Sequence, residues 1–140
     1  MIVILEDDER RTTAMKQELE DKFPNMAYQF FDNAPEMIEW LKENMSSVKL
    51  MSLDHDLGAS RDKEGERFEP GIGRDVVDFL ITQKERFPLI LHTTNIEAGY
   101  GMKFALEEVE WRNEWIKPFN DLEWIELEWS RKINAIKLNG

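Results

Sequence analysis

The segment Ser52-Leu53-Asp54-His55-Asp56-Leu57-Gly58 follows a short apolar run, residues 48–51, that is typical of the end of a buried strand. Its three consecutive titratable side chains lie where such a strand would leave a sheet. The chain has only 2 histidines, and one of them lies within this triplet. Because an acidic–histidine–acidic cluster at a strand end adds little to packing, the segment predicts chemistry on a phosphate or a metal.

The composition is that of a soluble globular protein, and the length of 140 residues predicts one domain, residues 1–140. The formal net charge of −11 and the lack of a Lys/Arg-rich block argue against binding of duplex DNA or a long polynucleotide. The chain has no cysteine, which excludes disulfides, thiolate catalysis and cysteine-based zinc sites. The apolar start, residues 1–5, is too short for a signal peptide, and no run approaches the ~20 residues of a membrane span. We therefore expect a cytoplasmic protein with no membrane partner.

Short apolar runs alternate with segments of helical periodicity along the chain. The expected strands are residues 2–5, 28–31, 50–53, 89–92 and 115–116, and the expected helices are residues 10–23, 35–45, 76–81, 102–109 and 122–136. Asn33 with Pro35 marks a helix start, and Asn120 with Glu123 resembles a capping box. Five strand–helix repeats predict an α/β fold, a doubly wound five-stranded parallel sheet with helices on both faces.

Polar side chains follow four of the predicted strands. They are Asp7-Asp8 after the first strand, Asp54-His55-Asp56 after the third, His92-Thr93-Thr94-Asn95 at the end of the fourth and Lys117-Pro118 after the fifth. In open parallel sheets, ligands bind outside the carboxyl ends of the strands, near the point where strand order reverses. The polar residues therefore predict a site at this edge. The long charged connection from Gly58 to Gly73 is either a lid or binding loop or a surface insertion.

These residues resemble the receiver domain of bacterial response regulators, over the whole chain. The resemblance implies that Asp7 and Asp8 hold magnesium, with Glu6 and Asp7 as an alternative pair. It implies that Asp54 is the phosphoacceptor, and that Thr93 and Lys117-Pro118-Phe119 correspond to the switch threonine and the invariant lysine with its proline.

The departures from an ordinary receiver are informative. Ordinary receivers lack the run Asp54-His55-Asp56-Leu57-Gly58, and they do not usually have a histidine directly before the switch threonine. These features, with Asp7-Asp8-Glu9-Arg10, His92-x-x-Asn95 and Met102, are similar to a divergent branch, the cyclic-phosphate-processing receiver domain. The resemblance implies an enzyme whose activity is itself an inference in that family.

The predicted cofactor is Mg²⁺, which prefers oxygen ligands and keeps several waters. Its expected ligands are Asp7 or Asp8, Asp54 and the backbone carbonyl of Asp56. Phosphate binding is expected from the hydroxyl of Thr93 or Thr94, from Asn95 and from the charge of Lys117. Together these groups would stabilise charge on a phosphoryl group in transfer.

Two mechanisms fit these residues. In the first, Asp54 attacks phosphorus and forms an acyl phosphate. In the second, Asp54 only binds metal, and two histidines act as acid and base on a cyclic phosphodiester, because histidine titrates close to neutral pH. The carboxylates beside His55 favour the acid role for it and leave His92 as the base.

Two alternatives remain open at this point. His55 is either a catalytic group or a bystander that caps or packs. Side chains alternate along a strand, so if Thr93 points into the site, His92 points to the other face as a core histidine. If the strand bends there, or Thr94 takes the hydroxyl role, His92 faces the site.

Four of the 5 tryptophans, Trp111, Trp115, Trp124 and Trp129, fall in the last third of the chain. They form either a Trp-rich C-terminal face for a dimer or a protein partner, or part of the core, which is the better reading for Trp115 and Trp129 on apolar stripes.

The leading prediction of function is magnesium-assisted phosphoester chemistry on a small cyclic phosphate or a cyclic-phosphate RNA end. The alternative is a single-domain response regulator phosphorylated on Asp54 by a histidine kinase. A third reading is a degenerate receiver kept as an interaction module, which would require the acidic site to be idle.

Overall fold

The centre of the molecule is a parallel five-stranded sheet, seen in a computed structural model that describes residues 1–59 and 61–139. The strands are β1 (Ile2–Leu5), β2 (Tyr28–Phe31), β3 (Leu50–Leu53), β6 (Leu89–Leu91) and β7 (Asn113–Trp115). Their order is β2-β1-β3-β6-β7, and all four neighbouring pairs are parallel. The predicted fold class is confirmed. Strand order reverses between β1 and β3, which places the expected ligand site after these two strands.

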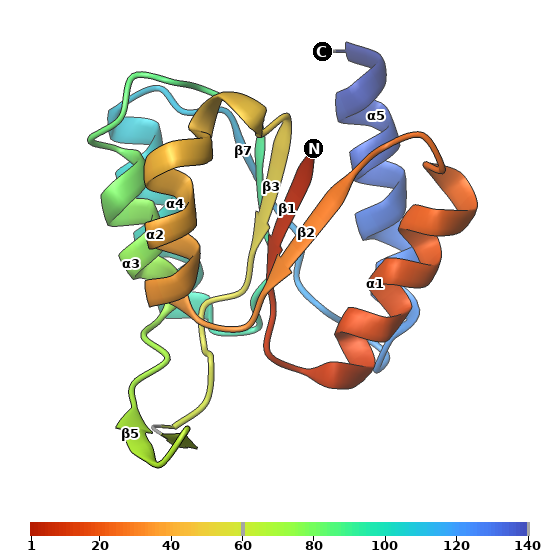
Figure 1. Ribbon diagram of the computed structural model, residues 1–140. Helices are drawn as coiled ribbons and strands as arrows, with labels where there is room; N and C mark the ends of the chain where they lie inside the picture. The colour runs from red at the N-terminus through yellow and green to blue at the C-terminus, as the bar shows by residue number, and fades with distance from the viewer. Residues whose placement is uncertain (60, 140) are drawn as a thin grey trace.

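The helices cover both faces of the sheet (Figure 1). The helical elements are α1 (Glu9–Lys22), α2 (Ala34–Asn44), the 3₁₀ turn η1 (Met45–Ser47), α3 (Gly73–Leu80), α4 (Ile96–Glu108), the π-helical segment η2 (Ile125–Ser130) and α5 (Arg131–Asn139). Helices α2, α3 and α4 lie on one face, and α1 and α5 lie on the other. None of the helices within the described ranges has the length and apolar character needed to cross a membrane.

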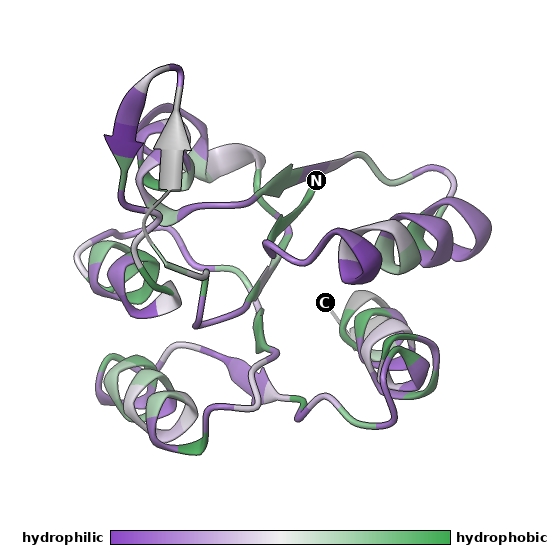
Figure 2. Ribbon diagram, turned by 90° about the horizontal axis from the view of Figure 1, so that it is seen from below, coloured by the Kyte–Doolittle hydropathy of each residue, from purple (hydrophilic) through white to green (hydrophobic). Residues whose placement is uncertain are grey.

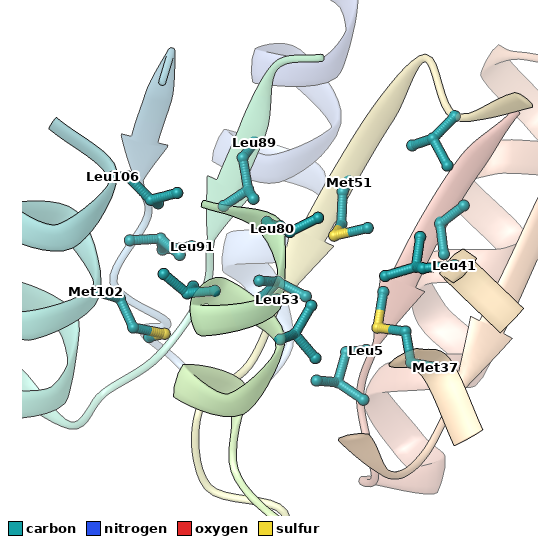
Figure 3. Close-up of a cluster of buried hydrophobic side chains, with 14 of the residues drawn as sticks. Leu5, Met37, Leu41, Met51, Leu53, Leu80, Leu89, Leu91, Met102 and Leu106 are labelled. Atoms are coloured by element: carbon teal, nitrogen blue, oxygen red, sulfur yellow. The ribbon is translucent and has the colours of Figure 1, made fainter. Parts of the chain in front are cut away.

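The central strands β1, β3 and β6 are apolar on both sides because both faces of the sheet are covered. All four residues of β1 and of β3 are buried. On the side of α2, α3 and α4, leucines and methionines such as Leu5, Met51 and Leu91 form one cluster (Figure 3). On the other side, Ile4 and Ile90 pack against α1, η2 and α5. Ser52 is the exception, a polar side chain buried at 0% exposure within β3.

The long connection after Gly58 contains a β-hairpin, which the sequence did not predict. It pairs β4 (Arg61–Lys63) with β5 (Glu66–Phe68) in antiparallel register. The two turn residues, Glu64 and Gly65, both have positive φ, 53° and 81°, and this conformation matches the twist of a two-residue hairpin. The hairpin lies at the end of the molecule where the strands of the main sheet finish (Figure 1).

The last helix also begins differently from the prediction. Asn120 and Asp121 have positive φ values of 47° and 58°, and the Asn120 side chain donates to the Glu123 carboxylate rather than capping a backbone N–H. The chain then passes through η2 before α5 begins at Arg131. A π-helical turn of this kind often lies near a functional site.

Candidate metal and phosphate site

An acidic cluster lies after β1 and β3. It consists of Glu6, Asp7 and Asp54, whose ligand oxygens all lie within 4.8 Å of one another. The pairing of Leu5 with Leu53 brings the residues that follow β1 and β3 side by side. Figure 2 views this end of the molecule, where the connection leaving β1 is strongly hydrophilic. Three carboxylates in this arrangement match the oxygen ligands that Mg²⁺ prefers.

The structure assigns Asp8, a predicted metal ligand, to a different task. Its carboxylate accepts hydrogen bonds from the backbone N–H groups of Arg10 at 2.9 Å and Arg11 at 3.1 Å, so it is the N-cap of α1. Its own backbone N–H donates to Glu6 Oε2 at 3.0 Å. Of the two acidic pairs that the sequence allows, Glu6-Asp7 and Asp7-Asp8, the geometry therefore favours Glu6-Asp7 beside Asp54.

Burial disfavours the charged form of the carboxyl groups in the acidic cluster. Glu6 is 2% exposed and Asp54 is 6% exposed. Burial, helped by the nearby charge of Glu6, raises the pKa of Asp54 to about 8. The same two causes raise the pKa of Asp7 above its ordinary value. Burial also works to raise the pKa of Glu6, but hydrogen bonding from His92 and Asp8, with the Arg11 charge, brings it below the ordinary value. A divalent cation would relieve this repulsion, so these residues fit one.

Arg11 is a site residue that the sequence analysis missed. Its Nη1 lies 3.6 Å from Glu6 Oε1 and 3.9 Å from Asp54 Oδ2, and its guanidinium lies 5.4 Å from the ring centroid of Trp124. It reaches the cluster from the first turn of α1, and its side chain keeps 23% exposure. A guanidinium at this position can pair with phosphate oxygens. The available signal was only that two arginines, Arg10 and Arg11, directly follow the acidic run of residues 6–9.

His55 forms a cluster with Asp56 and Asn95. Its Nδ1 lies 2.9 Å from Asp56 Oδ1, and Asn95 Nδ2 donates to both oxygens of Asp56 at 3.3 and 3.2 Å. Asn95 is itself fixed, because its Oδ1 caps α4 by accepting from the N–H of Ala98 at 3.0 Å. With Nδ1 held by Asp56, Nε2 is the atom of His55 left for proton transfer. The backbone carbonyl of Asp56 as a metal ligand stays a prediction.

The hydrogen bonds of the His92 side chain are separate from those of His55. Its side chain is fully buried, its Nδ1 lies 2.6 Å from Ser52 Oγ, and its Nε2 lies 3.1 Å from Glu6 Oε1. It faces the side of α1 and α5, as alternation from Ile90 requires. Among the contacts of the described residues, the ring meets the acidic cluster at Glu6. This geometry does not support His92 as a base in contact with substrate.

The other predicted phosphate ligands are also engaged. Thr93 is fully buried, and its Oγ1 accepts from the backbone N–H of Asn95 at 3.0 Å. Lys117 Nζ lies 4.8 Å from the ring centroid of Trp115. Thr94 is more accessible, and with Arg11 and Phe119 it lines a concavity of about 280 Å³. A larger open pocket, about 610 Å³, adjoins the acidic cluster and is lined by Glu6, Asp7, Gln29, Phe30, Phe31 and neighbouring acidic residues.

Of the two readings of the tryptophan-rich segment, a partner face or part of the core, burial supports the core for most of these side chains. Trp111 is 2% exposed, and Trp124 and Trp129 are 0% exposed. Three exposed large apolar side chains lie on α4 instead. Ile96, Tyr100 and Phe104 recur every four residues and so form one stripe along that helix.

Gly73 fixes the backbone of the site from α3. Its N–H donates to the carbonyl oxygen of His55 at 2.8 Å. A Cβ at this position would collide with the carbonyl oxygen of Asp54 and lie 2.9 Å from the Cα of His55. Only glycine allows the first turn of α3 to approach this backbone.

We therefore expect Gly73→Ala to destabilise the protein by about 1–3 kcal/mol, the usual cost of forcing atoms into a packed site. Gly101→Ala is the matched control, because its Cβ would meet only the end of the flexible Arg74 side chain at 3.3 Å. Within α4, that change should be neutral or stabilising. Urea denaturation of both variants measures the difference, and equal stabilities would contradict the packing role of Gly73.

A doubly wound parallel sheet with an acidic cluster after its first and third strands defines a receiver domain. Among solved structures, the chain resembles the phosphorylated cyanobacterial phytochrome response regulator RcpA, with a TM-score of 0.72 and 16% identity over 98% of this chain and 92% of that chain. Residues 1–108 match the model of the cyclic-phosphate processing receiver domain, and the chain belongs to that family.

Two further solved structures share the fold. The response regulator domain of Thermotoga maritima CheB matches with a TM-score of 0.68 and 11% identity over 98% of this chain and 92% of that chain. The Mn²⁺-bound form of the response regulator Rcp1 matches with a TM-score of 0.66 and 14% identity over 98% and 93%. The search of curated proteins found no match.

Proposed function

We propose that the protein is a Mg²⁺-dependent phosphoesterase that opens a small cyclic phosphodiester, such as a 2′,3′-cyclic nucleotide or a cyclic-phosphate RNA end. The observation that carries the proposal is the pairing of two groups at the same edge of the sheet. A three-carboxylate cluster with its ligand oxygens within 4.8 Å of one another follows β1 and β3, and directly after Asp54 comes a histidine oriented by a carboxylate at 2.9 Å.

Glu6, Asp7 and Asp54 would hold the cation, with the carbonyl of Asp56 as a further ligand. When bound, Mg²⁺ would neutralise these carboxylates and stabilise negative charge on the phosphoryl oxygens. Arg11 adds a positive charge beside Glu6 and Asp54, at 3.6 and 3.9 Å. The net charge of the protein is −11, which disfavours a long RNA. A small substrate that binds at the cation and Arg11 fits better.

His55 carries the proton transfers in this proposal. Water adds to phosphorus, and His55 Nε2 takes the proton of that water. The bond from phosphorus to one ribose oxygen breaks, and a proton returns to that oxygen, so the products balance as one phosphomonoester with one free hydroxyl. Asp56 holds Nδ1 throughout and keeps the ring in one orientation. This version needs one histidine in contact with substrate, in place of the two predicted from the sequence.

A second candidate is phosphorylation of Asp54, because Asp54 occupies the end of β3 beside an acidic pair as in a phosphoacceptor receiver. In this case Asp54 attacks the phosphorus of an acyl phosphate or of a kinase phosphohistidine, and the donor group leaves. The fully buried hydroxyl of Thr93 and the position of Lys117 over Trp115 give this candidate less support.

One experiment separates the two. The protein is incubated with Mg²⁺ and a 2′,3′-cyclic nucleotide, and in parallel with acetyl phosphate. Multiple turnovers of the cyclic nucleotide that stop on chelation with EDTA support the phosphoesterase. A stoichiometric phosphoprotein that is lost in Asp54→Asn, without turnover, supports the phosphoacceptor. If neither turnover nor a phosphoprotein is detected, both candidates are overturned, and the interaction module is the reading that is left.

A further inference from the structure

A chain of buried hydrogen bonds joins the C-terminal segment to the acidic cluster. Trp129 Nε1 lies 2.9 Å from Ser52 Oγ, Ser52 Oγ lies 2.6 Å from His92 Nδ1, and His92 Nε2 lies 3.1 Å from Glu6 Oε1. Trp129, Ser52 and His92 are 0% exposed and Glu6 is 2% exposed. These hydrogen bonds cross the layer between η2 and the sheet, where most of the neighbouring side chains are apolar.

The donors fix the direction of this chain. An indole N–H can only donate, so Ser52 Oγ accepts from Trp129 and has its own hydrogen to give. At 2.6 Å, that hydrogen goes to His92 Nδ1, and the ring hydrogen is then on Nε2, which donates to the Glu6 carboxylate. In the opposite direction, the hydroxyl of Ser52 would accept twice, and its hydrogen would have no acceptor in the bonds described for it. This inferred order gives a hydrogen-bond partner to each polar side-chain atom of Trp129, Ser52 and His92.

The indole ring of Trp124 stacks against the imidazole ring of His92. The centroids of the two rings are 5.7 Å apart, and the interplanar angle is 25°. The guanidinium carbon of Arg11 lies 5.4 Å from the ring centroid of Trp124. The indole nitrogen of Trp124 has no hydrogen-bond partner among the described residues, so its contribution here is packing. Trp124 and Trp129 both lie outside residues 1–108, the part matched by the family model. The C-terminal segment therefore adds its own contacts to the site.

We propose that Ser52, His92 and Trp129 are positioning residues that hold the Glu6 carboxylate in the orientation that binds a divalent cation. A hydrogen bond to one oxygen of a ligating carboxylate fixes which lone pairs face the metal, and such outer partners strongly affect metal affinity. Metal binding is thereby coupled to the packing of η2 against the sheet, and the coupling is reciprocal. The proposal rests on the proposed function in one respect, that Glu6, Asp7 and Asp54 bind the cation.

The test is the affinity for Mn²⁺ alone, measured by electron paramagnetic resonance of the free ion, in Trp129→Phe and Trp111→Phe. Both changes remove one indole N–H from a buried ring. Trp129 donates to Ser52, whereas Trp111 donates to the carbonyl of Phe87 at 2.7 Å, outside the chain. We expect Mn²⁺ affinity to fall by about 10–100-fold in Trp129→Phe and to stay within about twofold in Trp111→Phe. Equal effects of the two variants would overturn the proposal.

Ser52→Ala gives a second, smaller deletion in case Trp129→Phe does not fold, as judged by circular dichroism. It should weaken Mn²⁺ binding in the same range, and unchanged affinity in this folded variant would overturn the proposal. Because the residues act in series, Trp129→Phe should add almost nothing to the loss of affinity in a Ser52→Ala background. Additive losses would mean that the residues act separately, which also overturns it.

Asp54→Asn separates this proposal from the proposed function. If Asp54→Asn abolishes Mn²⁺ binding while Trp129→Phe behaves like Trp111→Phe, the metal site stands and only the positioning chain fails. If Asp54→Asn leaves Mn²⁺ affinity unchanged, the metal site of the proposed function fails, and the positioning proposal is overturned with it.

Discussion

Replacement of His55 by glutamine is expected to slow turnover of a 2′,3′-cyclic nucleotide by about 10²–10⁴-fold, the range that a positioned acid–base group contributes. The reason is geometric: Asp56 holds Nδ1 of His55 at 2.9 Å, and only Nε2 remains to move a proton. Glutamine keeps a polar side chain but cannot exchange a proton near neutral pH. Steady-state kinetics at saturating Mg²⁺ measure the loss.

The affinity for Mn²⁺ should not change in His55→Gln, because the proposed cation ligands are Glu6, Asp7 and Asp54. Asp56→Asn is the matched variant: it leaves the imidazole in place but weakens its orientation, so the loss of turnover should be smaller. A His55→Gln variant with wild-type turnover would reject His55 as the acid–base group. A fall in Mn²⁺ affinity that matches the fall in turnover would instead make His55 a part of the metal site.

The main sheet could be predicted from the sequence because its strands are short apolar runs that are buried on both faces. Ile2–Leu5 and Leu50–Leu53 have no solvent face, so their pattern is unambiguous. The hairpin of β4 and β5 could not be predicted in this way. The side chains of Glu66 and Arg67 in β5 are exposed, and the hairpin sequence has no apolar alternation. Its only local signal was Gly65, which allows the tight turn.

The position of the acidic cluster could be predicted to within about one residue. Asp7 and Asp54 were expected because they follow neighbouring strands, and the structure brings their carboxylates together. The choice between Glu6 and Asp8 depended on where α1 begins, and the sequence left this open because either acid can cap a helix or bind a metal. The side of the sheet that His92 faces depended on a possible strand bend, and regular alternation from Ile90 settled it.

Asp54→Asn is expected to stabilise the metal-free protein at pH 8 while it abolishes binding of Mn²⁺. Burial and the charge of Glu6 raise the pKa of Asp54 to about 8 in the folded protein, from an ordinary value of 3.8. Between these two pH values, the folded chain retains a proton that the unfolded chain has lost. The contribution of Asp54 to stability is thus complete below pH 3.8, falls as the pH rises, and is lost once the pH passes about 8.

The measurement is the free energy of unfolding in urea, in EDTA, for wild type and Asp54→Asn from pH 4 to 9. The difference between the two proteins isolates Asp54, and it should change by no more than about 1.4 kcal/mol per pH unit, the limit for one proton. Mg²⁺ added at pH 8 should restore stability to wild type only, because the cation replaces the proton as the partner of Asp54. A pH-independent difference would show that the carboxyl of Asp54 ionises freely in the folded state, and the acidic cluster would then lack the repulsion that makes a divalent cation its natural partner.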